Sequence, residues 1–304
     1  MAGGQERLLR RRIRSVQSTK KITRAMELIA ASRIVKAQQR VAAARPYSEQ
    51  ITEVIRKLAA AGAGMNHPLL QKPEEIHKVG YVVLAADRGL AGGYNSSVIR
   101  AAERSIHRQQ ERGRDYHLVL VGRKAQSYFR YRRYDIAASF TGFSDNPSFE
   151  NAREVAAAVT EAFVDSDVDR VELVHTQFLS AGSQRVVVHR FLPLETEAIE
   201  EAAESGPKAD YEFEPEPDEI LARLLPRYVE SRLFAALLDA AASEHAARQR
   251  AMKSATDNAD ELITSLTRTM NRARQDSITT EIMEIVGGAE ALRQSKVNPF
   301  EESA

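Results

Sequence analysis

A glycine-rich segment is the part of the chain whose residues best suit ligand chemistry: Asp87-Arg88-Gly89-Leu90-Ala91-Gly92-Gly93-Tyr94-Asn95. It follows an apolar run and precedes a helix-like segment, and phosphates bind at such strand-to-helix turns in α/β sheets. The spacing matches neither a dinucleotide fingerprint nor a Walker A loop, because no Lys-Ser or Lys-Thr pair follows the glycines. A nucleotide site therefore stays open, but a tight turn that needs glycine is the preferred interpretation. The candidate residues of this loop are Asp87, Arg88, Gly89, Gly92, Gly93 and Asn95.

Other signals for catalysis are weak. The chain has no cysteine, which excludes disulfides, thiolate catalysis and cysteine-ligated metals. Its seven histidines are scattered along the sequence, and no Gly-x-Ser-x-Gly nucleophile motif occurs. We therefore expect no catalytic residue, no cofactor and no metal site.

The elements that position the glycine-rich loop alternate between strands and helices. Strands are expected at 76–86, 117–121, 135–140, 171–178 and 185–192, and helices at 97–112, 124–132 and 149–164. This order predicts a largely parallel sheet with helices on its faces, and the last two strands are candidates for a hairpin. Residues 75–195 are thus expected to form a central Rossmann-like α/β domain.

Long helices are expected on both sides of this domain, at 1–62 and 218–292, with an acidic linker at 196–217 between the domain and the second helix. Pro46 is a candidate kink, and Gly62-Ala63-Gly64 ends the first pattern. Apolar steps of three and four residues in the first helix include Ile13, Ile22, Met26 and Ile29. The second helix carries a 4-3 repeat at Phe234, Leu238, Ala241, His245, Arg248, Met252, Ala255, Ala259, Leu262, Leu266, Thr269 and Ala273. We expect the two helices to form an antiparallel coiled coil with a weak seam, because several of these positions are small or polar.

Charge is distributed unevenly along the chain. Residues 1–45 carry twelve Lys or Arg and two Glu, whereas residues 195–219 carry eleven Asp or Glu and one Lys. Such asymmetry is typical of interaction surfaces and also of solvated helix faces. Phosphate binding by a nucleic-acid-binding helix is one alternative, but the basic residues surround the helix and no nucleic-acid-binding module accompanies them. The sequence has no apolar run of about 20 residues that would span a bilayer, and no secretory signal.

Four segments, in order, resemble the gamma subunit of F-type ATP synthases: Ile13–Gln38, Asp87–Asn95, Ser243–Leu262 and Ile278–Ala291. The last contains Ile-Thr-x-Glu followed by an acidic residue and Gly-Ala. Ala91 departs from the family pattern, since many members have Cys there. The inserted dithiol segment of chloroplast members is absent, and the start of the chain lies close to the family's mature start, so a bacterial source is expected.

The resemblance implies a non-catalytic rotor shaft that couples proton-driven rotation of the c ring to conformational cycling of the catalytic beta subunits. Its implied partners are the alpha, beta and epsilon subunits and the c ring. It implies no nucleic-acid partner, and membrane association only through the c ring, at the cytoplasmic face of a bacterial plasma membrane. A nucleic-acid-binding protein and a small-molecule-binding α/β protein remain the alternatives.

Individual residues match the family's contact positions. Arg274 and Gln275 match a pair that hydrogen-bonds a loop of beta. Met26, with the basic neighbours Lys20, Lys21 and Arg24, matches positions near an acidic loop of beta, and Met26 is equally interpretable as a seam residue. Tyr211 lies where the family's foot meets the c ring and epsilon.

Overall fold

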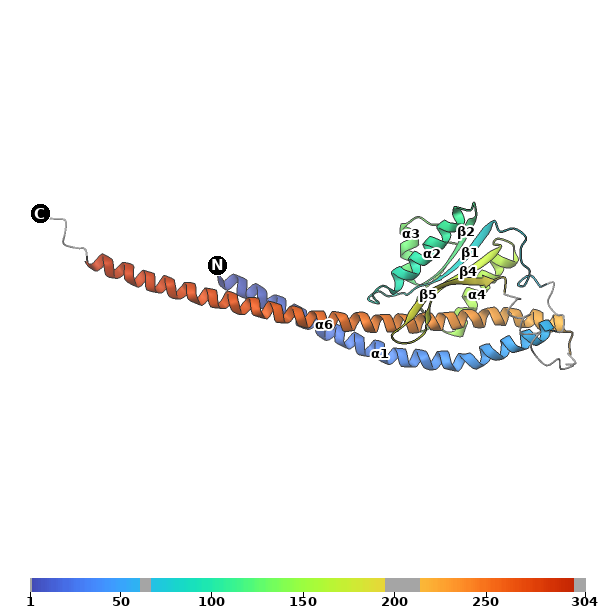
Figure 1. Ribbon diagram of the computed structural model, residues 1–304, viewed down its shortest axis with the longest axis horizontal. Coiled ribbons are helices and arrows are strands. Elements are labelled where there is room, and N and C mark those ends of the chain that lie inside the picture. Colours follow the sequence, from blue (N-terminus) through green and yellow to red (C-terminus); the bar gives the residue numbers. More distant parts are fainter. Residues whose placement is uncertain (1, 61–66, 195–213, 298–304) are drawn as a thin grey trace. The chain divides into compact units, whose positions relative to one another are not determined.

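The computed structural model describes residues 2–60, 67–194 and 214–297. Two long helices, α1 (Ala2–Ala60) and α6 (Pro217–Val297), enclose the remaining elements in the sequence (Figure 1). The chain forms two compact units. One combines the part of α1 up to Met26 with the part of α6 from Met252, and the other comprises Glu27–Ala251. Tyr211 and most of the predicted acidic linker lie outside the described residues.

The unit Glu27–Ala251 is built on a five-stranded sheet with the order β3-β2-β1-β4-β5. Its strands are β1 (Lys78–Leu84), β2 (Asp115–Val121), β3 (Ala138–Phe140), β4 (Arg170–Phe178) and β5 (Gln184–Leu192). The pairs β1–β2, β1–β4 and β2–β3 are parallel, whereas β4 and β5 are antiparallel neighbours. The predicted parallel sheet with a final hairpin is therefore confirmed.

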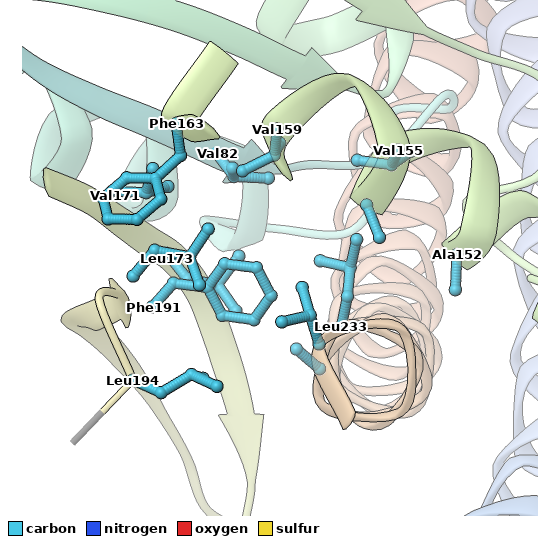
Figure 2. Close-up of a cluster of buried hydrophobic side chains, with 14 of the residues drawn as sticks. Val82, Ala152, Val155, Val159, Phe163, Val171, Leu173, Phe191, Leu194 and Leu233 are labelled. Carbon is cyan, nitrogen blue, oxygen red and sulfur yellow. The ribbon is translucent and has the colours of Figure 1, made fainter. Parts of the chain in front are cut away.

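Helices cover both faces of this sheet, and successive strand residues alternate between two cores. Val79, Tyr81 and Val83 of β1 pack in a cluster with α2 (Tyr94–Gln110) and α3 (Arg123–Tyr131). Val82 and Leu84 point to the opposite face, toward α4 (Phe149–Val164) and the first turns of α6. Side chains of the sheet, α4 and α6 meet in this second core (Figure 2). The later turns of α1 join it through Ile51, Ile55 and Leu58.

The other unit is a two-helix seam. The hydroxyls of Thr23 and Thr256 are 2.8 Å apart, and Lys20 forms an ion pair with Asp260. Buried Ile13 and Leu266 continue the seam farther along the two helices. Residue numbers rise along one helix as they fall along the other, so the predicted antiparallel pairing is confirmed.

The predicted α6 repeat is confirmed at Met252, Ala259, Leu266 and Ala273, whereas the alternate seam positions lie one residue later than predicted. Leu262 and Thr269 of α6 are exposed, while the buried and half-buried positions follow a 4-3 step through Met252, Thr256, Ala259, Ile263, Leu266, Met270, Ala273 and Ser277. In α1, Ile22 and Ile29 were expected on the packed face, but they are 60% and 55% exposed. Thr23 and Ala30 are buried in their place. The predicted face of α1 is confirmed at Ile13 and wrong at Ile22 and Ile29, where a threonine and an alanine pack in place of isoleucine.

Gly122 fixes the turn between β2 and α3. Its φ is +95°, and a Cβ built on it would lie 2.2 Å from the carbonyl oxygen of Ala85, the residue that follows β1. A side chain is therefore excluded both by backbone conformation and by contact with a neighbouring backbone. The sheet can bring β1 and β2 together at this end only because residue 122 has no Cβ.

We expect Gly122→Ala to lower the free energy of unfolding by at least about 2 kcal/mol, because strain and a backbone clash add. Gly113→Ala is the matched control, since Gly113 also has a positive φ of +74° but an added Cβ meets nothing within 4 Å. It should cost only about 1 kcal/mol. Urea denaturation of the full chain measures both, and equal losses would contradict the proposed clash.

Candidate functional site

The Asp87 carboxylate joins three loops at the carboxyl ends of neighbouring strands. One oxygen, Oδ1, accepts a hydrogen bond from the backbone N–H of Arg123 at 3.1 Å. The other, Oδ2, accepts from the N–H groups of Gly142 at 2.8 Å and Ser144 at 3.1 Å. The N–H of Asp87 itself donates to the Ser144 hydroxyl at 2.8 Å. Backbone amides of this kind bind the phosphate of a ligand in other α/β folds, but here the chain's own carboxylate accepts their hydrogen bonds.

The ionisation of Asp87 follows from this environment. Its side chain is only 9% exposed. Burial by itself raises the pKa of Asp87. The hydrogen bonds from Gly142, Ser144 and Arg123 lower this pKa by more than burial raises it, so it lies below its ordinary value of 3.8. The carboxylate is therefore ionised at neutral pH and acts as a structural acceptor.

The rest of the glycine-rich loop is also held by its own side chains. The Asn95 amide oxygen accepts from the N–H of Ala86 at 2.8 Å, and its nitrogen donates to the Arg88 carbonyl at 3.3 Å. Gly92 has a φ of +56°. Arg88, Gly92 and Gly93 are exposed. These contacts support the structural interpretation of Asp87 and Asn95, and they leave the start of α2 open.

Buried polar residues of α6 hold the loops that surround Asp87. Arg248 pairs with Glu244 at 2.6 Å and donates to the Gly89 carbonyl at 3.2 Å. The His245 Nε2–H donates to the Asp145 carbonyl at 3.0 Å, and the carboxylate of Asp145 pairs with Arg33 of α1 at 2.7 Å. Burial raises the pKa of Glu244, although Arg248 opposes the shift, and burial lowers the pKa of His245. The polar repeat positions 245 and 248 are therefore anchors for loops of the α/β part.

Sequence reasoning missed Asp145 and Glu244 in this arrangement. Their partners were visible, since a charged and a polar residue interrupt an apolar repeat at His245 and Arg248. Buried charges are nearly always paired, so the interruption itself was a signal for a partner. Glu244 lies four residues before Arg248 on the same helix, a spacing typical of ion pairs, whereas the loop that carries Asp145 reaches His245 only through the tertiary fold.

The predicted beta-contact residues fall in two places within the two-helix unit. Lys20, Lys21, Arg24 and Met26 lie on the α1 segment beside Thr256 and Asp260; Lys21 and Arg24 are exposed, and Met26 is half-buried. Arg274 and Gln275 lie about 14 residues beyond Asp260, or roughly 21 Å along the helix. Both are exposed, and neither side chain hydrogen-bonds to another described residue.

The described parts of the chain offer neither a metal site nor a membrane-spanning helix. No group of three or more His, Asp or Glu is placed there to hold a metal ion. None of the helices described is long and apolar enough to cross a membrane.

We expect Asp87→Asn to reduce the free energy of unfolding by about 1–3 kcal/mol at neutral pH, because the amide replaces an ionised acceptor of three hydrogen bonds. The folded-state pKa is depressed, so this stabilisation is present above the ordinary value of 3.8 and is lost as pH falls through the lower folded-state value. Urea titrations of parent and variant should therefore converge in acid. A difference that stays constant down to pH 2 would contradict the role of the ionised form.

Comparison with known proteins places these features in a family. The ATP synthase family model matches residues 5–292. The ATP synthase gamma chain of Frankia casuarinae is 54% identical over 293 residues, covering 95% of this chain and 98% of its own.

Solved structures agree with the sequence match. A chain of the Tetrahymena thermophila mitochondrial ATP synthase central stalk and c-ring structure is 25% identical, with a TM-score of 0.58, covering 77% of this chain and 99% of its own. A chain of the Euglena gracilis mitochondrial ATP synthase has the same fold, with a TM-score of 0.66 at 18% identity and 99% coverage of both chains. With its two long helices enclosing a Rossmann-like sheet, the chain belongs to the ATP synthase family, as a gamma chain.

Proposed function

We propose that this chain is the non-catalytic rotor shaft of an F-type ATP synthase. It couples proton-driven rotation of a c ring to conformational cycling of catalytic beta subunits. The observation that carries this proposal is the exposed apolar end of α6. All residues from 278 to 293 are exposed, among them the large apolar side chains Ile278, Ile282, Met283, Ile285, Val286 and Leu292.

An apolar helix end of this kind fits a protein sleeve. Exposed apolar side chains clustered over several turns mark an interaction surface. A sleeve of alpha and beta subunits would remove these side chains from water. Because the helix end has few charged groups, few ion pairs would hold it at one rotational angle within the sleeve. Because the shaft is not three-fold symmetric, each of three beta subunits would meet different side chains. Only such differential contact can shift the conformational populations of the beta subunits.

Charge supports contacts farther down the shaft. Lys21 and Arg24 present cationic groups at the surface of α1, and electrostatic complementarity to an acidic loop of beta would fix the register of the two partners. Met26 would place an apolar side chain beside that loop. Arg274 and Gln275 offer donors with no acceptor among the described residues, and we assign them to a second loop of beta.

The partners proposed are the alpha, beta and epsilon subunits and the c ring. The matched Tetrahymena thermophila structure is a central stalk with a c ring, which supports this assembly. Membrane association would be indirect, through the c ring, at the cytoplasmic face of a bacterial plasma membrane. The foot contact proposed for Tyr211 falls outside the described residues.

A tagged form of the chain, expressed in its source cell, should co-purify with alpha and beta subunits, whereas the isolated chain should hydrolyse no ATP. Affinity purification followed by mass spectrometry tests the first statement, and a phosphate-release assay tests the second. Recovery of the chain without either subunit, or turnover by the purified chain alone, would refute the proposal.

Arg274→Ala should lower ATP-driven proton pumping by reconstituted complexes several-fold relative to ATP hydrolysis, because a charge-assisted hydrogen bond to beta is worth about 1.5–3 kcal/mol. Arg268→Ala is the matched control, since Arg268 is an exposed arginine on the same helix. It should leave the ratio of pumping to hydrolysis at the parent value. If Arg274→Ala and Arg268→Ala had the same ratio of pumping to hydrolysis, the assignment of Arg274 to a coupling contact would be wrong.

A further inference from the structure

The structure holds a cleft that none of the contacts proposed above includes. Its volume is about 410 Å³, within the usual range for small-ligand sites. It lies at the carboxyl ends of the neighbouring strands β1 and β4. After β1 the chain continues to β2 and β3 on one side of β1, and it then returns to β4 on the other side, so the strand order reverses between β1 and β4. Ligands bind at this point in open α/β sheets.

The start of α2 forms one wall of the cleft, through Gly92, Gly93 and Ser97. No side chain caps this 17-residue helix, since residue 93 is glycine. In its first turn, the backbone amides of Asn95 and Ser96 donate no hydrogen bond to any other described residue. Unpaired amides at the positive end of a helix favour an anion.

A buried hydroxyl in the same cleft supplies a second and independent observation. Thr176 of β4 is 5% exposed, and its Oγ1 has no hydrogen-bond partner among the described residues. Thr176 shares a strand face with Val174, which packs in the cluster with α2, so its side chain points to the side of the sheet where the cleft lies. A buried hydroxyl without a partner is costly, and a ligand oxygen would satisfy it.

Arg250 supplies a positive charge at the same cleft. Its guanidinium donates to the Ala181 carbonyl at 2.6 Å and to the Gln184 amide oxygen, which hold it beside the turn between β4 and β5. The guanidinium has five N–H donors, so others stay available. No carboxylate is found among the described residues that line the cleft, and the remaining wall is formed largely by alanine and valine side chains.

We propose that this cleft binds a small phosphate-bearing molecule, with its phosphate held by the amides at the start of α2, the Thr176 hydroxyl and the Arg250 guanidinium, and its less polar part against the alanine and valine wall. The glycines at 92 and 93 leave the backbone open to the phosphate. The Asp87 carboxylate occupies the amides of the neighbouring loops, so the two anion positions are separate. The site goes beyond the rotor function and needs no other subunit.

Isothermal titration of the purified full chain with inorganic phosphate, AMP and adenosine tests the proposal. Phosphate and AMP should bind saturably, whereas adenosine should not. Tighter binding of AMP indicates that the apolar wall holds the rest of a phosphomonoester, and equal binding identifies free phosphate as the ligand. Hydrogen exchange at the first turn of α2 should slow with either bound probe.

Two variants and one control locate the binding. Arg250→Gln should weaken phosphate binding at least about tenfold, and Thr176→Val about fivefold without lowering the Tm, because the hydroxyl has no partner to lose. Arg153→Gln changes an exposed arginine of α4 that does not line the cleft, and this variant should bind as the parent does. No saturable binding of phosphate or AMP, adenosine binding as tight as that of AMP, or equal affinities in all three variants would overturn the proposal.

Discussion

One continuous helix, α6, has to satisfy three different environments along its 81 residues. Its first turns bury Leu221, Leu225, Val229 and Leu233 against the sheet and α4, where a thick core rewards bulky side chains. Beyond Met252 it buries Thr256, Ala259 and Leu266 in a seam with α1. From residue 278 it buries nothing within the described chain. The same helix is therefore packed on a thick core, paired with one other helix, and exposed, in turn.

The polar anchors lie between the first two environments. Glu244 and Arg248 form a buried pair, and a buried pair adds little stability over apolar residues of similar volume. The pair instead positions a loop, because Arg248 also donates a hydrogen bond to the Gly89 carbonyl. His245, on the same helix, likewise donates to the Asp145 carbonyl. Asp145 in turn pairs with Arg33 of α1. The loops of the sheet are thus connected to both long helices by directional bonds.

Much of this fold was predictable from periodicity. The strands and helices of the α/β part alternate clearly enough to give a parallel sheet with a terminal hairpin, and the long helices follow from three- and four-residue steps. The seam prediction failed at Ile22 and Ile29 because they are more hydrophobic than the buried Thr23 and Ala30 beside them. Leu262 and Ile263 are equally hydrophobic, so hydrophobicity could not choose between them. Hydrophobicity ranks residues by transfer from water, whereas close helices select side chains by size. Asp145, Thr176 and Arg250 carry no local motif, and only the tertiary fold brings Thr176 of β4 and Arg250 of α6 to one cleft.

Rotation of the α/β part together with the long helices is directly measurable, because the sequence has no cysteine. Tyr131→Cys places a unique thiol at a side chain that is 84% exposed on α3. A bead attached there, on complexes with alpha and beta subunits fixed to a surface, reports the motion of the sheet domain during ATP hydrolysis. We predict unidirectional rotation with three dwell angles per turn, one for each beta subunit. ATP hydrolysis at the normal rate with a stationary bead would contradict the account.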